Sequence, residues 1–119
     1  REYLDDTAAI LPVYALEEIV AEKLRSILQR GKSRDYFDVW LLLKDFGNDF
    51  DHQRAKAILR NKCRFKEIAE PKTEDFFERE RLAEAERFWD RGLAHQLTGL
   101  PGFQSVIAEL RPLLDKLIY

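Results

Sequence analysis

Three charged residues stand where the spacing of their neighbours predicts apolar helix surfaces, and these are Lys23, Asp35 and Asp38. At about 100° per residue, Lys23 falls between Ile19 and Ile27 on the apolar face of its helix. A charge in such a place costs free energy unless it is paired or used. We therefore expect the three side chains to converge at one point, where the ammonium could bind a phosphate or a carboxylate.

A structural explanation exists for each of these residues. Lys23 could bury its aliphatic stem and keep its ammonium in water. Arg34 lies four residues before Asp38 and could pair with it, while Asp35 could serve a helix N-terminus. Spacing alone leaves the structural and the functional interpretation open.

Two helices joined by a short turn must position these side chains. Residues 15 to about 30 are amphipathic and end at Gly31, which suits a left-handed cap. Ser33 is expected to cap the next helix, which runs to about Phe46. Residues 39–43 are apolar all round, which predicts a helix buried on several sides at the centre of the fold.

The apolar spacing of the remaining chain is also helical. It predicts helices from residue 52 to about 61, from 74 to about 97 with Phe88 in the apolar stripe, and from 103 to 118. Pro112 could kink the last of these, and residues 10–14 are expected to be extended. The predicted fold is all-α, a single bundle-like domain of about five helices.

Composition excludes several classes of protein. The 119 residues suit one domain, and a net charge of -2 gives no general attraction to nucleic acid or acidic membranes. Cys63 is the only cysteine, which excludes an intrachain disulfide and a thiolate zinc cluster. No apolar run reaches the about 18 residues that a membrane span needs, so we expect a cytoplasmic protein with no membrane partner.

Other catalytic arrangements have little support. Cys63, His52 and His95 are far apart and lie in no recognisable catalytic motif, and no glycine-rich phosphate loop is present. The sequence has no methionine and starts at Arg1, so we expect it to be a piece of a longer protein.

Residues 16–23 (LEEIVAEK) and 32–38 (KSRDYFD) resemble two motifs of the AbiEii/AbiGii family of nucleotidyltransferases. This family supplies the toxins of bacterial abortive-infection and type IV toxin–antitoxin systems. Its third motif has a glutamate and a lysine where this chain has Glu18 and Lys23. Its fourth motif is a basic pair followed by Asp-x-x-Asp. The family usually has arginine then lysine in the pair, whereas this chain has Lys32 then Arg34.

The resemblance implies the C-terminal helical part of a polymerase β-like nucleotidyltransferase, which transfers a nucleotide from an NTP to an acceptor, in some members a tRNA. Residues 88–89 and 100–103 are similar to the family's C-terminal helices. Lys23 would hold the triphosphate, and Asp38 would be a catalytic base or site organiser supported by Asp35. The substrate-binding residues implied are Lys23, Arg34, Lys32 and Glu18.

The family's first two motifs, a Gly-Ser loop and an Asp-x-Asp pair that binds magnesium, have no counterpart here. Residues 49–51 read Asp-Phe-Asp, but they lie in a polar loop with no strand before them. We therefore expect residues 1–119 to be a C-terminal helical domain without the N-terminal metal-binding domain, inactive alone. Magnesium and NTP would belong to the intact protein, with the missing domain, an antitoxin and a tRNA as partners.

A second hypothesis assigns no chemistry to the chain. It would be a helical interaction module that binds a partner protein such as an antitoxin, or packs on the missing domain. The upstream coding sequence distinguishes the two hypotheses.

Overall fold

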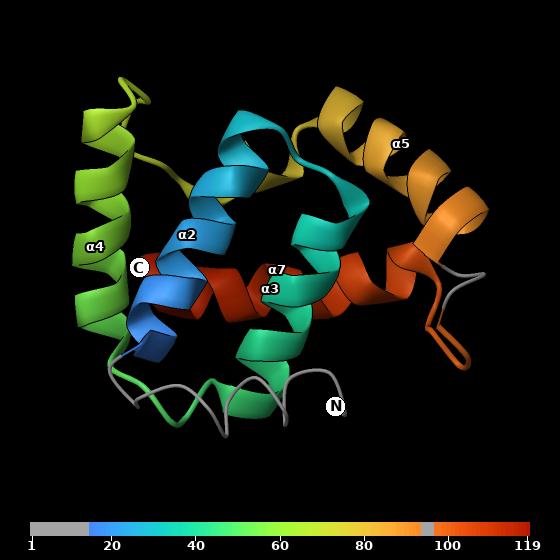
Figure 1. Ribbon diagram of the computed structural model, residues 1–119, viewed down its shortest axis with the longest axis horizontal. Helices are drawn as coiled ribbons and strands as arrows, with labels where there is room; N and C mark the ends of the chain where they lie inside the picture. The colour runs from blue at the N-terminus through green and yellow to red at the C-terminus, as the bar shows by residue number, and fades with distance from the viewer. Residues whose placement is uncertain (1–14, 94–96) are drawn as a thin grey trace.

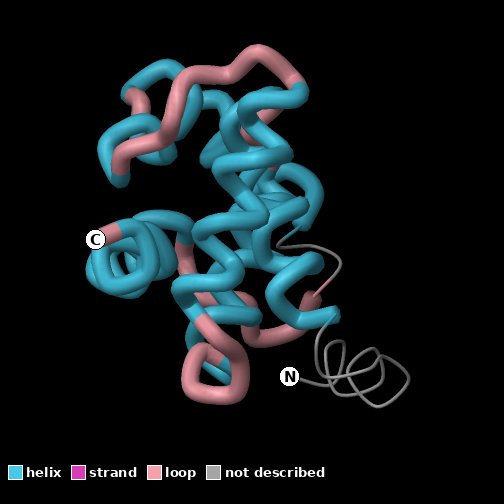
Figure 2. The backbone as a smooth tube through the Cα atoms, turned by 90° about the vertical axis from the view of Figure 1, so that its left-hand side faces the viewer, coloured by secondary structure: helices cyan, strands magenta, loops and turns pink. Residues whose placement is uncertain are grey.

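The computed structural model describes residues 15–93 and 97–119, and every regular element in these ranges is helical (Figures 1 and 2). The α-helices are α2 (Ala15–Gln29), α3 (Ser33–Phe46), α4 (His52–Phe65), α5 (Arg79–Phe88) and α7 (Phe103–Ile118). Two short elements, the 3₁₀ helix η1 (Thr73–Phe77) and the π-helical turn η2 (Trp89–Leu93), flank α5. The predicted all-α fold of about five helices is confirmed. The expected extended segment at residues 10–14, and His95, lie outside the described residues.

Helix α3 is the centre of the fold, as its continuous apolar run predicts. It packs against α2, α5, η2 and α7, and the side chains of residues 39–43 are all buried. Figure 1 shows α2 and α3 side by side, α4 along the outer side of α2, and α7 crossing behind both. None of the helices in the described ranges is both long and apolar enough to cross a membrane.

An aromatic cluster ties α3 to the C-terminal half of the chain. The ring centroids of Phe37 and Trp89 are 6.2 Å apart, and Phe103 lies 5.4 Å from Trp89 and 5.9 Å from Tyr36. The Tyr36 hydroxyl donates a hydrogen bond of 2.5 Å to the backbone carbonyl of Phe76. Burial raises the pKa of Tyr36 well above its ordinary value, so this donor keeps its proton. Edge-to-face rings with a satisfied hydroxyl make this a specific contact.

The predicted cap at Ser33 is wrong. Lys32 is the N-cap residue of α3, and Ser33 is already helical, with its hydroxyl donating to the carbonyl of Ala85 on α5. The Asp35 carboxylate takes over the capping function by accepting from the Lys32 N–H at 3.2 Å. An aspartate in the third helical position reaches back to the N-cap amide, which leaves the serine free to bond elsewhere.

The continuous helix predicted from residue 74 to about 97 is also wrong. The chain forms η1, passes through extended backbone at Glu78, and only then forms α5 and η2. Phe76 and Phe77 are both buried, and the Phe76 carbonyl is held by Tyr36, so tertiary contacts override the local helix propensity. Helix α4 is one turn longer than predicted and ends at Phe65.

Gly31 occupies the tightest position of the turn between α2 and α3. Its φ of +56° is the left-handed conformation that the sequence predicts for a helix cap. The side chain of Arg81, from α5, lies directly against it: a Cβ atom on Gly31 would meet Arg81 Cγ at 2.6 Å. The Arg81 guanidinium donates to the carbonyl of Ile27, a group that the end of α2 leaves without a helical partner.

Gly31→Ala should lower the free energy of unfolding by about 2 kcal/mol or more, because strained backbone adds to a displaced Arg81. Gly99→Ala is the matched control. Gly99 also has a positive φ, of +75°, but a Cβ there would meet nothing within 4 Å. It should cost only the backbone term, about 1 kcal/mol. Urea denaturation measures both, and an equal loss would contradict the role given to Arg81.

Candidate functional site

Lys23 and Asp38 meet, as the helix spacing predicts. Lys23 Nζ lies 2.9 Å from Asp38 Oδ2, and Arg34 Nε lies 3.2 Å from Asp38 Oδ1. The Asp38 side chain is only 14% exposed, whereas Lys23 and Arg34 are 35% and 49% exposed. One largely buried carboxylate therefore holds two cations whose side chains reach solvent.

The local sequence explains why these groups converge. Val20, Leu24 and Ile27 are fully buried, so the face of α2 that carries Lys23 must turn inward. Asp38 lies one turn before the buried Leu41 and Leu42 on α3. The turn at residues 30–32 folds α3 back beside α2, so that the two charges meet across the helix pair.

Asp35 is fully buried but joins a different pair. The Arg30 guanidinium donates to it twice, with Nε–Oδ2 and Nη2–Oδ1 distances of 3.0 Å each, and the Lys32 N–H adds a third bond. Hydrogen bonding to this carboxylate raises the pKa of Arg30. A bidentate arginine–carboxylate pair has a fixed geometry, so Asp35 locks the turn between α2 and α3. The structure does not bring it to Lys23.

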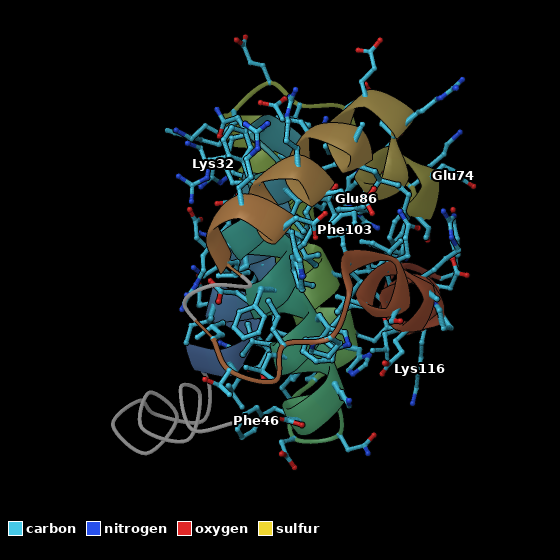
Figure 3. All side chains as sticks on the ribbon, turned by 90° about the vertical axis from the view of Figure 1, so that its right-hand side faces the viewer. Lys32, Phe46, Glu74, Glu86, Phe103 and Lys116 are labelled. Carbon is cyan, nitrogen blue, oxygen red and sulfur yellow. The ribbon has the colours of Figure 1, made fainter. Side chains whose placement is uncertain are left out.

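Glu18 and Lys32, the other predicted binding residues, lie apart from this pair. Glu18 is exposed and faces α4, where Lys62 Nζ lies 3.7 Å from its carboxylate and 3.2 Å from that of Glu22. Lys32 is exposed beside α5, as Figure 3 shows. The cluster of Lys23, Arg34 and Asp38, called here the lysine cluster, is therefore the part of the predicted site that the fold assembles.

A cavity of about 480 Å³ opens next to Arg34, between the α2–α3 turn and the α5–η2 segment. Its lining residues are Arg30, Gly31, Lys32, Ser33, Arg34, Glu84, Ala85, Phe88, Gly92 and Leu93. Phe88 is 55% exposed, although the sequence places it in the apolar stripe. The sequence could have indicated this exposure. Phe88 and Trp89 are consecutive, and consecutive residues on a helix point in different directions, so both rings cannot face the core equally. Trp89 is buried and leaves Phe88 at the cavity.

The described residues contain no group of three or more histidine, cysteine, aspartate and glutamate side chains that could hold a metal ion. This part of the chain therefore offers magnesium no such cluster of protein ligands. Cys63 is buried, and burial raises the pKa of its thiol, which suppresses the reactive thiolate. His52 stacks on Phe50 and bonds to the carbonyl of Gly47, which makes it a loop-stabilising residue.

The fold and the lysine cluster together define a helical domain that presents paired cations to solvent. The family model for the nucleotidyl transferase AbiEii toxin of type IV toxin–antitoxin systems matches residues 1–109. The match covers most of the 119 residues, so the chain belongs to the AbiEii nucleotidyltransferase toxin family. A toxin of this kind implies an antitoxin as partner. Neither the curated protein sequences nor the solved structures include a match to this chain.

The two aspartates should differ in what they stabilise. Asp35→Asn removes the buried charge that binds Arg30 and the Lys32 N–H, and it should lower the free energy of unfolding by about 2 kcal/mol. Asp38→Asn should cost less than about 1 kcal/mol, because Asp38 is 14% exposed whereas Asp35 is fully buried and also accepts from the Lys32 N–H. Thermal or urea denaturation measures the pair. Unchanged stability in Asp35→Asn together with lost nucleotide binding would instead make Asp35 a site residue.

Proposed function

We propose that this chain supplies the triphosphate-binding half of a nucleotidyltransferase and that Lys23 is the main phosphate contact. The observation that supports this most directly is the lysine cluster, in which two partly exposed cations share one largely buried carboxylate. Lys23 and Arg34 place two cations beside Asp38. A lysine ammonium is a compact charge with three donors, which suits phosphate oxygens.

Asp38 acts in this proposal as the organiser of the site. Its two oxygens each accept from a different cation, at 2.9 Å from Lys23 and 3.2 Å from Arg34. These contacts limit the rotamers of two long side chains before any substrate arrives. Pre-organised cations bind an anion with less loss of side-chain entropy. Arg34 contributes the second phosphate contact, and Lys32 of the α2–α3 turn contributes a third. Glu18 makes no phosphate contact in this proposal and acts only as a residue of helix α2.

We assign the metal chemistry to an N-terminal domain of the intact protein. Magnesium, when bound there, would neutralise the phosphates and hold the attacking and leaving oxygens. The residues described here would orient the triphosphate beside that domain, and alone they would not transfer a nucleotide. The acceptor in this proposal is a tRNA, the regulator is an antitoxin protein, and the reaction takes place in the cytoplasm.

Lys23→Ala should weaken NTP binding at least about tenfold, because a charge-assisted bond to phosphate is lost. It should leave the fold intact, because the pair with Asp38 is partly exposed. Lys44→Ala is the matched control: Lys44 is 48% exposed and pairs with Glu109 at 3.5 Å, on the α7 side of α3. Isothermal titration calorimetry measures the affinities. An equal effect of both substitutions, or none, would contradict the proposal and favour a non-catalytic interaction module.

A separate experiment tests whether the metal site belongs to an N-terminal domain. The coding sequence upstream should contain a Gly-Ser loop and an Asp-x-Asp pair on predicted strands. Protein that includes this segment should transfer a nucleotide with NTP and magnesium, whereas residues 1–119 alone should not. Turnover by the 119-residue chain would refute the assignment of the metal site to another domain.

A further inference from the structure

The cavity beside Arg34 has two walls of different chemistry. The α2–α3 turn and the first turn of α3 contribute the cationic wall, with Arg30, Lys32 and Arg34. The α5–η2 segment contributes a mainly apolar wall, on which Phe88 and Leu93 are the large side chains. Its volume of about 480 Å³ lies in the range of small-ligand sites.

The cationic wall is held in place by carboxylates behind it. Asp35 fixes the Arg30 guanidinium with two bonds of 3.0 Å, and Asp38 fixes Arg34 at 3.2 Å. Lys32 differs, since no acidic side chain in the described ranges forms an ion pair with it and its side chain is exposed. Among the described residues that line the cavity, Glu84 is the one acidic residue. An anion entering the cavity would therefore meet an ammonium that no carboxylate of the described residues pairs with.

The apolar wall depends on the π-helical turn η2. Its first residue, Trp89, is buried and donates from Nε1 to the Pro101 carbonyl at 3.1 Å, which anchors the turn. The preceding Phe88 stays 55% exposed at the cavity wall. Single π-helical turns recur at functional sites because they redirect the side chains around them. A Cβ atom on Gly92 would meet nothing within 4 Å, so this wall has free space in front of it.

We propose that this cavity binds one nucleotide unit, with its base against Phe88 and its phosphate against Lys32 and Arg30. An exposed aromatic face beside lysine and arginine is the arrangement that binds single nucleotides, by stacking and charge. Arg34 lines the cavity and also shares Asp38 with Lys23, so the cavity adjoins the lysine cluster. The inference rests on the proposed function, because the bound unit is one of its two reactants.

Two substitutions test the cavity, one by removing a side chain from its wall and one by filling its space. Phe88→Ala removes the stacking face, and Gly92→Trp fills the free space without backbone strain, because Gly92 has no positive φ. Phe65→Ala is the matched control, since Phe65 is an 83% exposed phenylalanine on α4 that does not line this cavity. The probes are ATP and a short single-stranded RNA with a 5′-hydroxyl end. Binding is measured by calorimetry and fluorescence anisotropy, and circular dichroism checks each fold.

Phe88→Ala and Gly92→Trp should each weaken the binding of one probe at least about tenfold, while Phe65→Ala leaves it unchanged. A loss with ATP assigns the cavity to the incoming nucleotide, and a loss with RNA assigns it to the acceptor strand. If neither substitution affects either probe while Lys23→Ala weakens ATP binding, the proposed function stands and the cavity inference is wrong. It is also wrong if the wild-type chain binds neither probe.

Discussion

The buried carboxylate of Asp35 is the interaction on which the arrangement of charges depends. It accepts from Arg30 twice and from the Lys32 amide once, and it has no exposure to water. A buried charge is tolerable only when its hydrogen bonds are satisfied, so this turn has one favourable geometry. The same turn sets the position of α3 beside α2 and thereby brings Asp38 to Lys23.

A second restraint acts on the same turn from outside. Arg81 of α5 lies over Gly31 and donates to the Ile27 carbonyl, while the Ser33 hydroxyl bonds to the Ala85 carbonyl. Helix α5 is therefore fastened to both sides of the turn by polar bonds of its own. These bonds restrain the separation of the two walls of the cavity between the turn and α5.

The helices and the meeting of Lys23 with Asp38 could be predicted because both follow from local periodicity. The face of α2 and the face of α3 are each specified by residues within two turns. The failures have non-local causes. Ser33 is not the N-cap residue: its hydroxyl donates to the carbonyl of Ala85, 52 residues away, while Asp35 accepts from the N-cap amide of Lys32. The helix expected from residue 74 is interrupted at Glu78, where Tyr36 holds the preceding 3₁₀ turn.

Within the predicted site, the sequence could not separate the two aspartates. Asp35 and Asp38 are three residues apart and share one side of α3, so periodicity gives them the same environment. Their partners differ because Arg30 sits at the end of α2, where a guanidinium can reach back over the turn, whereas Lys23 lies two turns earlier. The length and direction of these side chains decide the pairing, and neither is contained in the spacing.

The geometry around Asp38 gives a physical reason for the order of the two basic residues Lys32 and Arg34, which is the reverse of the order usual in the family's fourth motif. Arg34, in the second basic position, bonds Asp38 through Nε and lies over the Phe37 ring at 5.4 Å, so its planar group is held from two sides. Lys32, in the first position, is the N-cap residue and extends beside the cavity. The arginine, with its planar group, therefore occupies the position that pairs with Asp38, and the flexible lysine lines the cavity.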